Sequence, residues 1–144
     1  MTNPIFALLW GAFKKAAWAP IAVFVIHTVS TQFFRAYFHL PSLDTIEHFV
    51  GGIAIAYFFY HLLESVRSTL FQPRYEIAMQ NVIVFLATGT TTVLWEFTEY
   101  ILDHTWVIHG LRQGSVGDTM LDMALGMAGG ICYLVIRSRT YKLP

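Results

Sequence analysis

Residues 76–102 read EIAMQNVIVFLATGTTTVLWEFTEYIL, and this stretch decides the fold class. No charged residue separates Glu76 from Glu96. A helix needs about 20 mostly apolar residues to cross the hydrocarbon core of a bilayer, so we predict a transmembrane helix here. Glu96 and Glu99 lie near its far end, although acids within such helices are costly and usually serve a function. The stretch therefore predicts both a membrane fold and a polar site.

Three further stretches are long and apolar enough to span, at residues 18–38, 43–63 and 116–136. Residues 1–17 place apolar side chains at helical spacing ahead of Lys14 and Lys15, which is typical of an interfacial amphipathic helix. A short fifth span is the alternative. We therefore predict an all-α fold in one membrane domain, residues 1–144. It is a polytopic helical bundle of about four transmembrane helices plus this N-terminal helix.

The composition agrees with a membrane protein and excludes several other classes. Of the 144 residues, 56% are hydrophobic and only 12% are charged, whereas soluble proteins average about 25% charged residues. The net charge of zero argues against nucleic acid as a partner. A single cysteine, Cys132, excludes intramolecular disulfides and cysteine-based zinc sites. No nucleotide-binding motif is present, so we expect no nucleotide cofactor.

The basic residues indicate the orientation. In a four-span arrangement, seven of the nine Lys and Arg residues share one side: Lys14, Lys15, Arg67, Arg74, Arg137, Arg139 and Lys142. The positive-inside rule assigns that side to the cytoplasm. We therefore expect a multi-pass protein of a bacterial inner membrane with both termini cytoplasmic. If residues 1–17 span, only the N-terminus changes side.

The acidic residues have the opposite distribution. Seven of the nine fall on the outer side of the predicted spans: Asp44, Glu47, Glu96, Glu99, Asp103, Asp118 and Asp122. They come from three different spans, at residues 43–63, 76–102 and 116–136. Three helices are therefore expected to bring carboxylates to one depth. This convergence depends on the span assignment and on no motif.

Their spacing sharpens this expectation. Glu96 with Glu99, Asp118 with Asp122, and Asp44 with His48 are three or four residues apart, so each pair shares a helix face. Such a group of carboxylates cannot stay fully ionised without cations. We expect a divalent metal, Zn, Mn, Fe or Mg, because carboxylates with an imidazole suit these ions. The predicted ligands are Glu96, Glu99, Asp118, Asp122, His48 and Asp44.

Other polar residues have weaker predicted roles. Glu47 is adjacent to His48 and should point elsewhere, so we rank it below the other acids. Arg35 and Arg112 are predicted to bind an anionic group of a substrate, since guanidinium matches phosphate geometry. His27 is expected to serve in packing or in a hydrogen bond between helices. The pair Gly126 and Gly130, like other small pairs, is expected to let helices approach closely.

Three segments, taken in order, resemble the YjdF-like family of uncharacterised bacterial inner-membrane proteins: DTIEHFVGG at 44–52, WEFTEY at 95–100 and GDTMLDM at 117–123. The chain is more distantly similar to VanZ-like proteins, from which it departs by having acids, Glu99 and Asp122, where amides are expected. The resemblance covers residues 43–130. It implies a membrane architecture, and it implies site positions at Asp44, His48, Glu96, Glu99, Asp118, Asp122 and Gly126.

Three hypotheses for function follow. The first is a metal-dependent site on the extracytoplasmic side that acts on a lipid headgroup, an undecaprenyl-type carrier lipid or another amphiphile. It would make the protein a membrane hydrolase or headgroup transferase, although no nucleophile identifies a catalytic residue. The second is ion or proton binding or transport. The third is an accessory protein whose polar network only holds the bundle together. Membrane lipids are the expected partners, and homo-oligomers are left open.

Overall fold

The computed structural model describes residues 4–34, 39–40, 42–105 and 115–140. Its helices are α1 (Pro4–Ala16), α2 (Trp18–Gln32), α4 (Ser42–Glu64), α5 (Arg67–Leu70), α6 (Glu76–Thr105) and α7 (Val116–Thr140). The described residues contain no strand. The predicted all-α membrane bundle is therefore confirmed.

Three helices, α4, α6 and α7, are each long and apolar enough to cross a membrane. The expected first span, residues 18–38, is described only as far as residue 34. The described helix that starts at Trp18 ends at Gln32, and its 15 residues cover about 22 Å, short of a hydrocarbon core of about 30 Å. α1 and α2 pass the same test only together, with a bend of 41° between them. The helix expected to be interfacial is therefore the first half of a bent pair.

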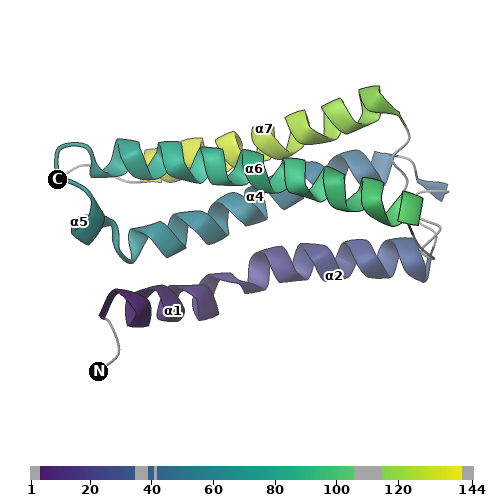
Figure 1. Cartoon of the computed structure of the whole chain (residues 1–144). Helices are drawn as coiled ribbons and strands as arrows, with labels where there is room; N and C mark the ends of the chain where they lie inside the picture. The colour runs from purple at the N-terminus through teal and green to yellow at the C-terminus, as the bar shows by residue number, and fades with distance from the viewer. Residues whose placement is uncertain (1–3, 35–38, 41, 106–114, 141–144) are drawn as a thin grey trace.

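The helices run along a common direction, and the two ends of the bundle differ (Figure 1). α1, α5 and the last turns of α7 lie at one end. That end carries most of the basic residues: Lys14, Lys15, Arg67, Arg74, Arg137 and Arg139. The last turns of α2 and α6 and the first turns of α4 and α7 lie at the opposite end. We call this opposite end the acidic end.

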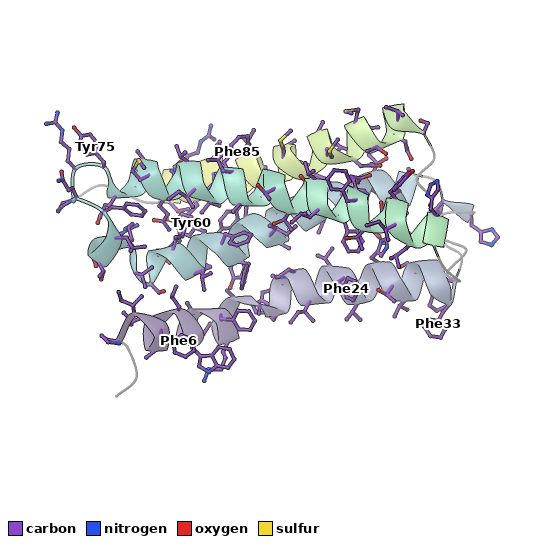
Figure 2. The ribbon with its side chains drawn as sticks, viewed as in Figure 1. Phe6, Phe24, Phe33, Tyr60, Tyr75 and Phe85 are labelled. Carbon is purple, nitrogen blue, oxygen red and sulfur yellow. The ribbon has the colours of Figure 1, made fainter. Side chains whose placement is uncertain are left out.

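Large apolar side chains cover the outside of the bundle (Figure 2). Phe6 is 61% exposed and Phe33 is 78% exposed. In water such exposure on all sides would be unfavourable, whereas in a bilayer these side chains meet lipid tails of similar polarity. The fold thus has a lipid-facing surface and a core built largely from small and polar residues.

Glycines bring α4 and α7 into backbone contact. A Cβ atom on Gly52 would strike the backbone of Gly126, and one on Gly129 would strike the carbonyl oxygen of Phe49. On α6, the methyl groups of Thr92 and Thr88 occupy the space beside Gly126 and Gly130. Close approach through small residues is how membrane helices gain packing energy without a hydrophobic driving force.

The buried face of α6 continues along the bundle as a row of residues spaced about four apart: Gln80, Val84, Thr88, Thr92 and Glu96. The hydroxyl of Thr88 donates to the carbonyl of Val84, and that of Thr92 donates to the carbonyl of Gly89, both at 2.8 Å. Thr88 and Thr92 therefore belong to one buried row, although the sequence alone shows only scattered threonines. Its hydroxyl groups are used within α6 itself.

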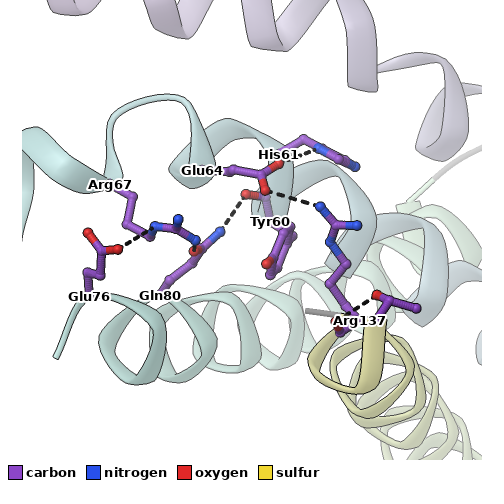
Figure 3. A network of polar contacts seen from close by, with 8 residues as sticks. Tyr60, His61, Glu64, Arg67, Glu76, Gln80 and Arg137 are labelled. Atoms are coloured by element: carbon purple, nitrogen blue, oxygen red, sulfur yellow. Dashed lines mark hydrogen bonds and ion pairs between the residues drawn. The ribbon is translucent and has the colours of Figure 1, made fainter. Parts of the chain in front are cut away.

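A polar network closes the basic end (Figure 3). Arg67 pairs with Glu76 at 3.5 Å and donates to Gln80, which in turn donates to the backbone carbonyl of Tyr60. Arg137 pairs with Glu64 at 3.1 Å. Each of the two acids here thus faces an arginine, and the network links α4, α5, α6 and α7.

The glycine contact predicts a position-specific effect on stability. Gly52→Ala should cost about 1–3 kcal/mol, because the new methyl group has only backbone to displace. Gly51→Ala is the matched control, since its Cβ would lie 3.8 Å from Val23, an ordinary contact. Thermal unfolding of both variants in detergent tests this. Equal melting temperatures for the two variants would contradict the packing described.

Candidate functional site

His48 of α4 lies at the centre of the acidic end. Its Nε2 atom is 3.4 Å from Asp44 Oδ1, one turn earlier on α4, and 4.0 Å from Asp122 Oδ2 on α7. Its Nδ1 atom is 3.7 Å from Glu96 Oε1 on α6. The imidazole therefore has carboxylates on both of its nitrogen sides, and three helices supply them.

Two of the three glutamates of α6, Glu96 and Glu99, are deeply buried. The indole nitrogen of Trp95 donates a hydrogen bond to Glu99 Oε1 at 2.9 Å, which holds that carboxylate in place. Glu96 is 3% exposed, and its Oε1 atom accepts no hydrogen bond from any described residue. A buried carboxylate oxygen without a donor is costly, so this atom calls for a proton or a cation.

The charges at the acidic end are poorly compensated. No Lys or Arg of the described ranges forms an ion pair with Asp44, Glu96, Glu99 or Asp122, and the ion pairs of three of them are with His48 alone. One imidazole supplies at most one positive charge. At the basic end, by contrast, Glu64 and Glu76 each pair with an arginine. The four carboxylates therefore need protons or an added cation to stay buried together.

The donor atoms are close enough together to hold a metal ion. Two groups have ligand atoms that all lie within 4.8 Å of one another: Asp44, His48 and Asp122, and His48, Glu96 and Glu99. Two ligands bound at about 2.0–2.2 Å in tetrahedral geometry lie about 3.3–3.6 Å apart, close to the 3.4 Å between Asp44 and His48. The residues present thus suit a divalent ion, with His48 common to both groups.

The structure brings together five of the six predicted ligands. Asp118 is half-buried near the start of α7, where its backbone amide donates to Ser115 Oγ at 3.1 Å, and it belongs to neither donor group. The predicted substrate-binding residues Arg35 and Arg112 lie outside the described residues. The predicted site is therefore described without its two proposed anion-binding side chains.

Glu47 faces α2 and not the acidic cluster. Its Oε2 atom is 2.9 Å from Nδ1 of His27, and both side chains are almost completely buried. Sequence reasoning did not find this pair, because the two residues are 20 positions apart and no local spacing joins them. The pair attaches α2 to α4 through a polar contact. It lies beside Trp95, whose ring centre is 5.1 Å from that of His27.

A groove of about 240 Å³ lies between α2, α4 and α6, and we call it the lateral groove. Its apolar lining includes Pro20, Val23, Phe24, Gly51, Ile55 and Trp95. Its polar lining includes His27, Glu47 and His48. His48 therefore borders both the lateral groove and the acidic cluster, so the two features are continuous.

The model of one protein family, described as "Predicted membrane protein (DUF2238)", matches residues 7–142 of the chain. An uncharacterised protein of Thermotoga maritima is 32% identical over 119 residues, which cover 80% of this chain and 58% of that protein. The chain thus spans little more than half the length of this relative. No solved structure matches the chain.

Because the acidic end lacks compensating positive charge, we predict that replacing one of its acids by a neutral residue raises the melting temperature. Without metal, Glu96→Gln should raise the melting temperature, by about 4 °C for about 1 kcal/mol. The amide is always neutral, whereas the buried Glu96 carboxyl must either take up a proton or stay charged with no donor to its Oε1 atom. Glu64→Gln at the basic end is the control and should lower it, since Arg137 loses its partner. Thermal unfolding after chelator treatment compares them. A loss for Glu96→Gln as large as that for Glu64→Gln would contradict the imbalance.

Proposed function

We propose that the acidic end of this chain, which belongs to the DUF2238 family of predicted membrane proteins, binds a divalent metal ion within the membrane. The observation that carries the proposal is the convergence on His48 of one half-buried carboxylate from α4 and buried carboxylates from α6 and α7. No arginine or lysine of the described ranges pairs with them. A divalent cation supplies the missing positive charge. We further propose that the chain is YjdF-like; its more distant similarity to VanZ-like proteins stays a prediction.

His48 can serve a metal from either side of its ring. Through Nε2 it faces Asp44 and Asp122, and through Nδ1 it faces Glu96. A histidine that binds a metal through one nitrogen commonly donates its other N–H group to a carboxylate. In the first arrangement the ion lies among Asp44, His48 and Asp122, while Glu96 orients the ring. The second donor group, with Glu96 and Glu99, is the alternative: the ion would then bind Nδ1, because a neutral imidazole offers a lone pair on only one of its nitrogens.

The donor chemistry limits the identity of the ion. Carboxylate oxygens with one imidazole suit Zn, Mn, Fe or Mg better than copper, which favours softer or nitrogen-rich ligands. Such an ion polarises a phosphoryl oxygen or activates water. We propose that it acts on, or binds, the headgroup of a membrane amphiphile. No nucleophilic side chain is assigned a catalytic role.

We propose that the acidic end faces the extracytoplasmic side of a bacterial inner membrane. The basic residues gather at the opposite end, on α1, α5 and α7, and the positive-inside rule places such an end in the cytoplasm. Both termini would then be cytoplasmic. Substrates would reach the site from the outer leaflet.

Ion transport receives less support from the bundle. The buried row on α6 that leads from Glu96 toward the basic end is interrupted by Val84, which is fully buried. The hydroxyl groups of Thr88 and Thr92 donate to their own helix. No observation among the described residues favours a polar path across the membrane over a site restricted to one end.

Metal content tests the proposed function. Protein purified without chelator should carry stoichiometric metal by elemental analysis, and Asp44→Asn with Asp122→Asn should lower the affinity about tenfold or more. Glu96→Gln with Glu99→Gln tests the second donor group. Loss of metal in only one of the two double variants would identify the donor group that binds the ion. Glu64→Gln with Glu76→Gln is the matched control and should retain metal.

Two outcomes would reject the metal site. One is wild-type protein that is stable and metal-free, and that gains no thermal stability from added Zn, Mn, Fe or Mg. The other is metal that is retained at full stoichiometry in both double variants of the acidic end. In either case the cluster would be a protonated network that holds the helices together.

Thiol labelling tests the orientation. In a Cys132→Ala background, Ser115→Cys at the acidic end should react with an impermeant reagent in intact cells. Thr140→Cys at the basic end should react only after the cells are opened. The reversed pattern would place the site on the cytoplasmic side.

A further inference from the structure

We propose that the lateral groove holds one hydrocarbon chain of a phosphate-headed membrane lipid, so that the headgroup lies at the acidic cluster. The proposal that a hydrocarbon chain binds here rests on the groove alone. The phosphate part rests on the proposed function, because a bound metal ion is what would attract an anionic headgroup to carboxylates.

The walls of the groove match a hydrocarbon chain. Val23 and Phe24 contribute from α2, Ile55 contributes from α4, and Gly51 leaves room between those two helices. A Cβ atom on Gly51 would lie 3.8 Å from Val23, so a larger side chain there would extend into the groove. The volume of about 240 Å³ is below the roughly 300–1,000 Å³ typical of sites for drug-sized ligands. A single narrow chain suits this space.

We infer that the entrance to the groove lies between α2 and α6, on the lipid-facing surface. Among the described residues, no Cα atom of α2 lies within 8 Å of a Cα atom of α6. The two helices meet through side chains, with ring centres of Phe24 and Trp95 6.0 Å apart. Phe24 is 54% exposed on the membrane-facing surface, so it forms part of the rim. A lipid can therefore enter laterally without passing through water.

The polar end of the groove decides which lipid is preferred. A chain already dissolved in the bilayer gains little by moving into an apolar groove, because both surroundings are equally apolar. Selectivity must therefore come from the headgroup, which would lie beside His48. With a metal ion bound there, phosphate oxygens can complete its coordination. Without a metal ion, the same carboxylates would favour a cationic headgroup.

Photolabelling tests both parts. The probes are a phosphatidic acid with a diazirine in one chain and a diacylglycerol with the same chain. In metal-loaded protein, phosphatidic acid should label groove residues of α2, α4 and α6. Gly51→Leu should reduce this labelling about tenfold, because the leucine side chain would fill part of the groove. Ile55→Phe is a second blocking variant in case Gly51→Leu does not fold.

Matched controls distinguish failure of the proposed lipid groove from failure of the proposed metal site. Val50→Leu changes a side chain that is 42% exposed next to Gly51 and should leave labelling unchanged. Metal analysis of every variant accompanies the labelling. Labelling that is equal in wild type and both blocking variants overturns the chain site. A groove that labels as expected in protein that never binds metal supports the chain site even though the proposed metal function has failed.

The headgroup preference has its own test. Metal-loaded protein should label several-fold more with phosphatidic acid than with diacylglycerol, and a chelator should abolish the difference while the labelled residues stay the same. Equal labelling by the two probes in metal-loaded protein overturns the phosphate assignment. Competition by a lipid with a quaternary ammonium head that exceeds competition by phosphatidic acid also overturns it, in favour of a cationic amphiphile.

Discussion

The backbone contact between α4 and α7 at Gly52 and Gly126 determines the position of the site. His48 and Asp122 each lie one helical turn before these glycines, on two helices that run in the same direction. Thr92 of α6 fills the same layer, and Glu96 lies one turn further on that antiparallel helix. A layer of small side chains thus places His48, Asp122 and Glu96 together in the next layer. Larger residues in the layer of Gly52 and Gly126 would move His48, Asp122 and Glu96 apart.

Buried charge is compensated differently at the two ends of the bundle. At the basic end each of Glu64 and Glu76 has an arginine, so the charges are neutralised within the chain. At the acidic end four carboxylates surround a single histidine in the described structure. An arrangement that only needed to join helices would be expected to resemble the first end, because an uncompensated buried charge destabilises a fold. This difference supports the proposal that a cation binds at the acidic end.

The position of α2 connects the acidic cluster to the lipid. The contact between His27 and Glu47 attaches α2 to α4, and ring contacts connect α2 to α6 without close backbone approach. This looser packing leaves the lateral groove, which ends at His48. The proposed metal site would thereby be open to a molecule dissolved in the membrane. Site and groove are best understood as one feature.

The all-α membrane bundle and the gathering of acids at one end can be predicted from the residues alone, because hydropathy, helix length and spacing along a helix are local properties. α1 and α2 form a bent pair, and residues 35–38 of the expected first span lie outside the described residues. Only the tertiary structure decided that His48 lies between Asp44, Asp122 and Glu96, that Asp118 joins neither donor group, and that Glu47 faces His27. These facts depend on how each helix is rotated about its own axis. That rotation is set by contacts between residues far apart in the chain, such as Gly52 with Gly126, which no local pattern specifies.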